Sequence, residues 1–184
     1  MAYYSLVASL PHLKIGDEPP FSLEEYVGNC SQWVTEHETR ILEHILLGEH
    51  EGHGSGCHIC KRWFDIETQI SNAVARHRGQ KLGVDFKEFL HAHEGFSGEI
   101  EQLVTDAFTR NDPLEIEEEL DRARWQLADE LSSGKDPFCF EKVLAYGIQL
   151  KIVERWNRMD VHTGKEKLEA VITANTEKQE TAEA

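Results

Sequence analysis

The stretch DPFCFEKVLAYGIQLKIVERWNRMD, residues 136–160, decides the fold that the sequence predicts. Asp136 can accept hydrogen bonds from the free N–H groups at the start of a helix. Pro137 suits the first helical position, because the N–H that it lacks would have no helical partner there. We therefore expect a helix near residues 137–160, about 36 Å long at 1.5 Å per residue.

This helix is apolar on most of its circumference. Its main apolar stripe recurs at every fourth position, at Phe140, Leu144, Ile148 and Ile152. From residue 143 to residue 153 only two side chains, Gln149 and Lys151, are strongly polar. A helix with this pattern is covered by protein on most sides, and its apolar run is too short for a bilayer, which needs about 20 residues. We expect an all-α protein, a single multi-helix bundle around this long buried helix.

Two capping boxes indicate that the N-terminal part is helical as well. Ser22 with Glu25, and Thr35 with Glu38, have the spacing at which each side chain bonds the other residue's backbone N–H. Helices are therefore expected directly after Ser22 and after Thr35.

The domain organisation follows from composition. Residues 49–59 are rich in glycine and interrupt the helical patterns, so we expect a loop and candidate hinge there. Residues 175–184 contain no apolar side chain larger than alanine, and we expect a disordered tail. Residues 1–174 are predicted to form one all-helical domain.

The net charge of the chain is −15, from 19 basic and 34 acidic residues. This surplus argues against nucleic acids and anionic membrane surfaces as partners, because both carry negative charge. A basic protein partner fits it better, and we expect no direct membrane insertion. The chain has four cysteines and no basic segment followed by an apolar one at its start, which predicts free thiols in the cytoplasm.

Histidine and cysteine gather in the glycine-rich loop. His50, His53, Cys57 and Cys60 lie within eleven residues, and zinc is bound by four such side chains in a tetrahedron. These four are our candidate zinc ligands, and no other cofactor is indicated. Because only three residues separate His53 from Cys57, the spacing is cramped, and a polar loop without metal is the alternative.

Two weaker patterns involve the same residue types. Cys57-x-x-Cys60 at the start of a helix would have lowered thiol pKa values, as in disulfide oxidoreductases, but no strand precedes it. The pair His91 and His93 could hold a metal, although two ligands alone are a weak signal.

Four polar residues interrupt the apolar pattern of a helix expected over residues 60–78. They are Glu67, Asn72, Arg76 and Arg78. If this face is buried, they must pair with one another or with a partner chain. We consider them candidate interface residues, and the alternative is a solvated helix face.

Motifs of catalysis are missing from the sequence. It has no G-x-x-x-x-G-K-[ST] phosphate loop, no G-x-S-x-G elbow and no H-E-x-x-H pair. We name no catalytic residue and expect a protein that is not an enzyme by itself.

Several segments are distinctive when they are taken together. They are YYSLVASLP (3–11), PPFS (19–22), WFDIE (63–67) with Asn72 and Arg78, LAYGIQLKI (144–152), ERW (154–156) and Gly164. They resemble an uncharacterised bacterial family that is encoded in operons of V/A-type ATPases. The similarity extends over most of residues 3–172.

In those operons the family takes the place of the C-type stalk component, called d-type in eukaryotes, an all-helical part that joins the rotor axle to the membrane ring. The resemblance implies a non-catalytic accessory or central-stalk subunit of a V/A-type rotary ATPase. Its partners would be rotor subunits, and its place would be cytoplasmic, at the inner membrane through the ion-translocating complex. The alternative is a zinc-binding regulatory module that uses the His50–Cys60 loop.

Overall fold

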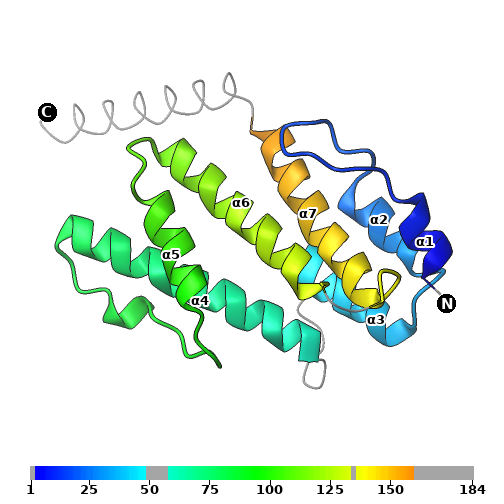
Figure 1. Ribbon diagram of the computed structural model, residues 1–184, viewed down its shortest axis with the longest axis horizontal. Coiled ribbons are helices and arrows are strands. Elements are labelled where there is room, and N and C mark those ends of the chain that lie inside the picture. The colour runs from blue at the N-terminus through cyan, green and yellow to red at the C-terminus, as the bar shows by residue number, and fades with distance from the viewer. Residues whose placement is uncertain (1–2, 49–57, 134–135, 160–184) are drawn as a thin grey trace, which may run out of the picture.

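The computed structural model describes residues 3–48, 58–133 and 136–159, which form helices joined by loops (Figure 1). The helices are α1 (Tyr4–Ser9), α2 (Leu23–Cys30), α3 (Glu36–Leu42), α4 (His58–Leu82), α5 (Gly98–Ala107), α6 (Pro113–Leu131) and α7 (Phe140–Arg158). A π-helical turn, η1 (Glu43–Leu47), continues α3, and a 3-10 turn, η2 (Lys87–Phe89), follows α4. The protein is all-α, as predicted.

Helix α7 is the central helix of the bundle. It packs against α6, which lies beside it in Figure 1, and against α2, α3 and η1. The predicted stripe is buried along its whole length, at Phe140, Leu144, Ile148 and Ile152. Leu150 and Val153 are also buried, with exposed fractions of 0% and 1%. The helix is therefore covered on more than one side, which confirms the prediction of a buried helix in this stretch.

The start of α7 was predicted too early. Cys139 is the N-cap residue, and the helix runs for 19 residues from Phe140. Asp136 Oδ1 accepts a hydrogen bond from the Phe138 N–H at 2.9 Å, so the carboxylate closes a turn before the helix instead of capping it. Helix α4, with 25 residues, is longer than α7.

Both predicted capping boxes are present. Ser22 Oγ accepts from the Glu25 N–H at 3.1 Å, while the Glu25 carboxylate accepts from the Ser22 N–H at 2.9 Å. Thr35 and Glu38 make the same reciprocal pair at the start of α3. These caps fix the first turns of two helices that pack against α7, and Tyr26 of α2 donates a hydrogen bond to the α7 backbone at 2.6 Å.

Helices α4, α5 and α6 form the other side of the bundle, where α5 packs against both of its neighbours (Figure 1). Helix α4 continues past the predicted end at residue 78. Gly79 lies inside it and gives room to Phe86, which a Cβ at this position would approach to 2.7 Å. The helix ends where Gly83 takes a positive φ of 66°.

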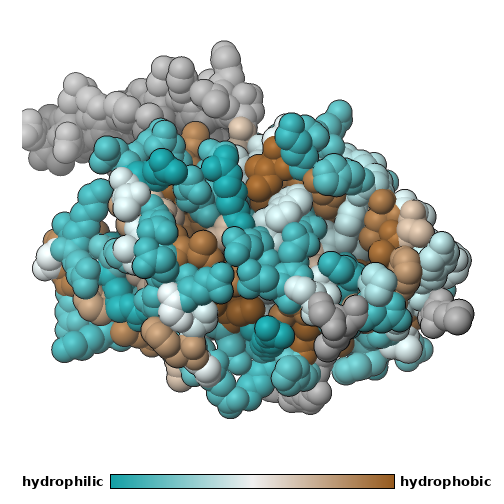
Figure 2. All heavy atoms as spheres, in the orientation of Figure 1, coloured by the Kyte–Doolittle hydropathy of each residue, from teal (hydrophilic) through white to brown (hydrophobic). Residues whose placement is uncertain are grey.

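Hydrophilic residues cover most of the face that Figure 2 shows. On the face shown in Figure 2, hydrophobic residues appear only as small separate patches among polar ones. Within the described residues, no helix is both long enough and apolar enough to cross a membrane. Most of the predicted hinge loop 49–59 and the whole of the predicted tail 175–184 lie outside the described residues.

Candidate interaction groove

A groove of about 950 Å³ lies between η1, α4, α6 and α7, with the start of α2 at its edge. Its apolar lining consists of Leu23, Ile45, Leu46, Leu47, Trp63, Phe64, Ile148 and Ile152. Most of these side chains belong to the core, but Phe64 is 41% exposed. The groove therefore has an apolar floor that a partner can reach.

Charged side chains form a network along the groove, centred on Asp121 of α6. Asp121 is only 1% exposed. Its carboxylate accepts hydrogen bonds from Arg124 at 2.9 Å, from Arg155 at 3.1 Å and from the Trp156 indole N–H at 2.9 Å. Two arginines and an indole N–H thus donate to one buried carboxylate. Arg155 and Trp156 belong to α7.

The network continues from Asp121 to α4 and along α6. Arg124 Nε donates to both carboxylate oxygens of Glu67, at 3.1 and 3.2 Å. Arg155 also pairs with Glu117 at 2.9 Å, and Arg78 of α4 pairs with the same carboxylate at 3.1 Å. A continuous chain of ion pairs therefore connects α4, α6 and α7.

The ion-pair partners of Arg124 and Glu117 favour the charged forms of these two groups. Burial opposes the charge of Arg124, but Glu67 and Asp121 outweigh burial and raise its pKa. Burial alone would raise the pKa of Glu117, whereas the hydrogen bond and charge of Arg155 lower it below the ordinary value. In both cases the partner stabilises the charged form, and hydrogen bonds between charged groups are strong.

Glu154 connects α7 to the beginning of α2. It is 5% exposed, accepts from the Leu23 N–H at 2.7 Å and pairs with Arg158 at 2.7 Å. Leu23 is the first residue of α2, where a carboxylate meets an unpaired N–H and the positive end of the helix dipole. This contact places α2 at the edge of the groove.

Lys151 of α7 lies next to the π-helical turn η1. Its ammonium group donates to the Ile45 carbonyl at 3.0 Å. Burial lowers the pKa of Lys151, and the charge of Glu67 acts in the opposite direction. A π turn changes the carbonyl partners of the normal helix, and here one of its carbonyl groups binds a lysine from α7.

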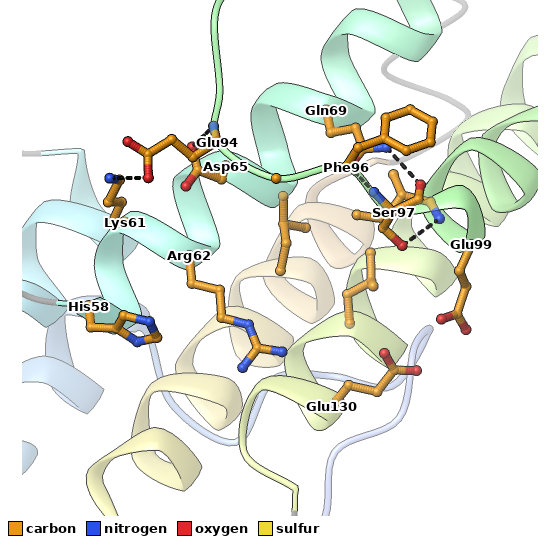
Figure 3. Close-up of a pocket in the computed structure, with 14 residues that line it drawn as sticks. His58, Lys61, Arg62, Asp65, Gln69, Glu94, Phe96, Ser97, Glu99 and Glu130 are labelled. Carbon is orange, nitrogen blue, oxygen red and sulfur yellow. Dashed lines mark hydrogen bonds and ion pairs between the residues drawn. The ribbon is translucent and has the colours of Figure 1, made fainter.

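A second hollow, of about 490 Å³, lies between α4, α5, α6 and the loop before α5 (Figure 3). Side chains of α4 hold the loop there: Asp65 accepts from the Glu94 N–H at 2.9 Å, and Lys61 pairs with the Glu94 carboxylate. In Figure 3, Arg62 of α4 and Glu130 of α6 lie on opposite sides of this hollow. The wall of the hollow mixes these charged side chains with apolar ones, among them Ile66, Ile100 and Leu127.

The four candidate interface residues all have partners inside the chain. Glu67 pairs with Arg124 and Arg78 with Glu117, as described above. Arg76 donates to both oxygens of Glu101, at 2.6 and 2.7 Å, and Asn72 bonds the backbone of His91. We expected these residues to pair with one another or with a partner chain. They pair instead with other residues of this chain, and their contact with a partner chain stays a prediction.

The zinc prediction falls mostly outside the described residues, because His50, His53 and Cys57 belong to residues 49–57. Cys60 is described, at the beginning of α4, and is 1% exposed within the core. In the part of the chain that the structure describes, no group of three or more His, Cys, Asp or Glu side chains is placed to hold a metal ion. Zinc binding by the loop stays a prediction.

The sequence reasoning missed the centre of the network. Asp121 precedes the buried Ala128 by seven residues, so a carboxylate on the apolar stripe of α6 was the available signal. Glu154 and Arg155 directly follow the apolar run of α7. The sequence does not show that Asp121 and Arg155 are partners, because they are 34 residues apart.

Residues 97–179 match a family model described as a protein of unknown function, DUF2764. The matched range is less than half of the chain and contains α5, α6 and α7, the helices that carry Asp121, Glu154 and Arg155. No curated protein and no solved structure matches the chain.

Proposed function

We propose that this protein is a non-catalytic accessory or central-stalk subunit of a V/A-type rotary ATPase, where it links the rotor axle to the membrane ring. The proposal starts from the resemblance of segments such as residues 144–152 to a family encoded in ATPase operons. Those residues lie in α7, and both α7 and α6 belong to the range matched by the family of unknown function. Part of the resemblance therefore falls on the central helix of the bundle.

The observation that carries the proposal is the chain of ion pairs through Asp121. A part that transmits torque must resist sliding of its helices past one another. Buried hydrogen bonds between charged groups are sensitive to distance and angle, so they favour one relative position of α4, α6 and α7. This supports a stiff mechanical connector.

The charge of the chain supports a docking role as well. A net charge of −15 attracts a basic partner, such as a basic tip of the rotor axle. Electrostatic complementarity of this kind chiefly sets the rate and the orientation of docking.

The test is purification of the native ATPase from the organism that encodes this chain. We expect the polypeptide to co-purify with the rotor subunits in a fixed ratio. Deleting its gene should abolish ATP-driven ion transport and leave ATP hydrolysis by the isolated soluble head unchanged, because the catalytic sites belong to other subunits. A fully assembled, ion-transporting ATPase without this polypeptide would overturn the proposal.

A further inference from the structure

We propose that the groove between η1, α4, α6 and α7 binds an amphipathic helix of a partner protein. The apolar face of that helix would be bordered by carboxylates. The inference rests on the proposed function in one respect: the proposed function places this partner among the components of the ATPase. The groove, its floor and its charges are properties of this chain alone.

The shape and lining of the groove suit a helix. Its volume of about 950 Å³ is near the upper end of the range of pockets that hold drug-sized ligands. Ile152 of α7 and Trp63 of α4 contribute to the floor, and Phe64 stands at the groove with 41% of its surface exposed. Grooves with apolar floors commonly receive one face of an amphipathic helix, with anchors three or four residues apart.

The positive charges that α7 contributes to the groove lie nearer the solvent than their carboxylate partners. Lys151, Arg155 and Arg158 follow one another at spacings of four and three on α7, so they form one row along the groove. The side chains of Arg155 and Arg158 are 42% and 72% exposed, whereas their carboxylate partners Asp121 and Glu154 are 1% and 6% exposed. Arg155 and Arg158 therefore face the solvent and their carboxylate partners lie beneath them, while Glu24 at the start of α2 is an exposed carboxylate of the same lining.

Among the described residues, no carboxylate forms an ion pair with the ammonium group of Lys151. Its hydrogen bond goes to the Ile45 carbonyl, and no ion pair with Lys151 is formed within residues 3–48, 58–133 and 136–159. An ammonium group has three N–H donors. A carboxylate on a docked helix would form a charge-assisted hydrogen bond with this group beside the apolar floor.

The same row of cations selects against other occupants. A basic helix would place its charges against Lys151, Arg155 and Arg158. A nucleic acid would meet the same row, but its phosphate backbone offers no apolar face to the floor of the groove. An acidic amphipathic helix can place its apolar face on the floor and its carboxylates against the row of cations.

A site-specific photocrosslinker tests the occupant directly. The full chain carries p-benzoylphenylalanine in place of Phe64 and is expressed in its native cells. The matched control carries the crosslinker in place of Phe96, which is 75% exposed at the second hollow. We expect one crosslinked peptide at position 64, absent at position 96, with apolar residues at helical spacing and flanking Asp or Glu. A crosslink to residues 160–184 of this chain, to a second copy or to a basic segment, or no crosslink, would overturn the inference.

A synthetic peptide with the crosslinked sequence then measures affinity for the purified chain. We expect Phe64→Ala and Lys151→Gln each to weaken binding by about tenfold, and the loss from Lys151→Gln to shrink at high salt. Phe96→Ala and Lys81→Gln, matched changes at exposed positions outside the groove, should bind as the wild type does. Unchanged affinity of both groove variants would overturn the inference.

The two proposals fail separately. If position 64 crosslinks to an acidic amphipathic helix while an assembled, ion-transporting ATPase lacks this polypeptide, the groove inference stands and the proposed function fails. If the chain co-purifies with the ATPase while both groove variants bind normally, the proposed function stands and the groove inference fails.

Discussion

Asn72 of α4 and the backbone of His91 exchange two hydrogen bonds. The Asn72 amide donates to the His91 carbonyl at 2.7 Å, and the His91 N–H donates to Asn72 Oδ1 at 2.9 Å. Gln69, almost one turn earlier, makes the same exchange with the backbone of Ser97, at 2.7 and 3.0 Å. Two buried side-chain amides thus hold the segment 91–97 against α4, in the way that a neighbouring strand would.

We predict that Asn72→Ala lowers the free energy of unfolding by about 1–3 kcal/mol, because two backbone groups lose their partners. The loop between α4 and α5 should then be cleaved faster by a protease. Denaturant unfolding and limited proteolysis measure the two effects. The control is Asn157→Ala at an exposed position of α7, which should change neither. Equal cleavage of Asn72→Ala and the wild type would show that the amide does not hold the loop.

A second prediction concerns Gly147, where α7 passes close to η1. A Cβ at this position would lie 2.5 Å from Leu46 Cδ1 and 3.0 Å from a ring carbon of Tyr26. Because both neighbours are buried, Gly147→Ala should cost about 1–3 kcal/mol through overpacking. Gly28→Ala in α2 is the matched control: nothing lies within 4 Å of its Cβ, so the helix should gain up to about 1 kcal/mol. Thermal unfolding should show shifts of opposite sign.

Local signals explain what the sequence predicted correctly. A capping box such as Ser22 with Glu25 is complete within four residues, and the buried stripe of α7 repeats within one helix. The residues Asp136 and Pro137 do not determine where α7 starts, because Asp followed by Pro suits a turn as well as a helix cap. The structure has the turn, with Asp136 bonded to the Phe138 N–H.

The site could not be predicted because its contacts are long-range. Glu67 was recognised as an unusual polar residue, but its partner Arg124 is 57 residues away. The bond between Lys151 and the Ile45 carbonyl depends on a π-helical turn, for which the stretch 43–47 carries no recognised sequence signal. Pairs of this kind follow from how whole helices pack, which periodicity does not determine.

We predict that Asp121→Asn lowers the free energy of unfolding by about 1–3 kcal/mol, because Arg124 and Arg155 each lose one of their two carboxylate partners. The matched control is Glu118→Gln, which removes an i,i+4 pair with Arg122 at the surface and should cost no more than about 0.5 kcal/mol. Denaturant unfolding at neutral pH gives both values. A loss for Asp121→Asn as small as that of the control would mean that the network contributes little to the packing of α6 against α7.

The last prediction concerns acid pH and Glu101 of α5, which pairs with Arg76. Burial alone would raise the pKa of Glu101, but hydrogen bonds from Arg76 and Gln69 lower it below the ordinary value of 4.5. The folded protein therefore binds this proton less tightly than the unfolded chain. The stability that results is present above pH 4.5 and is lost as the pH falls through the lower pKa of the folded state.

The difference in unfolding free energy between the wild type and Glu101→Gln should accordingly be largest near neutral pH and shrink below pH 4.5. Denaturant unfolding at a series of pH values measures it. Asn157→Ala removes no titrating group, so its effect should be the same at every pH. If the difference for Glu101→Gln is equally constant, Arg76 does not lower the pKa of Glu101, and the contact between α4 and α5 does not depend on this ion pair.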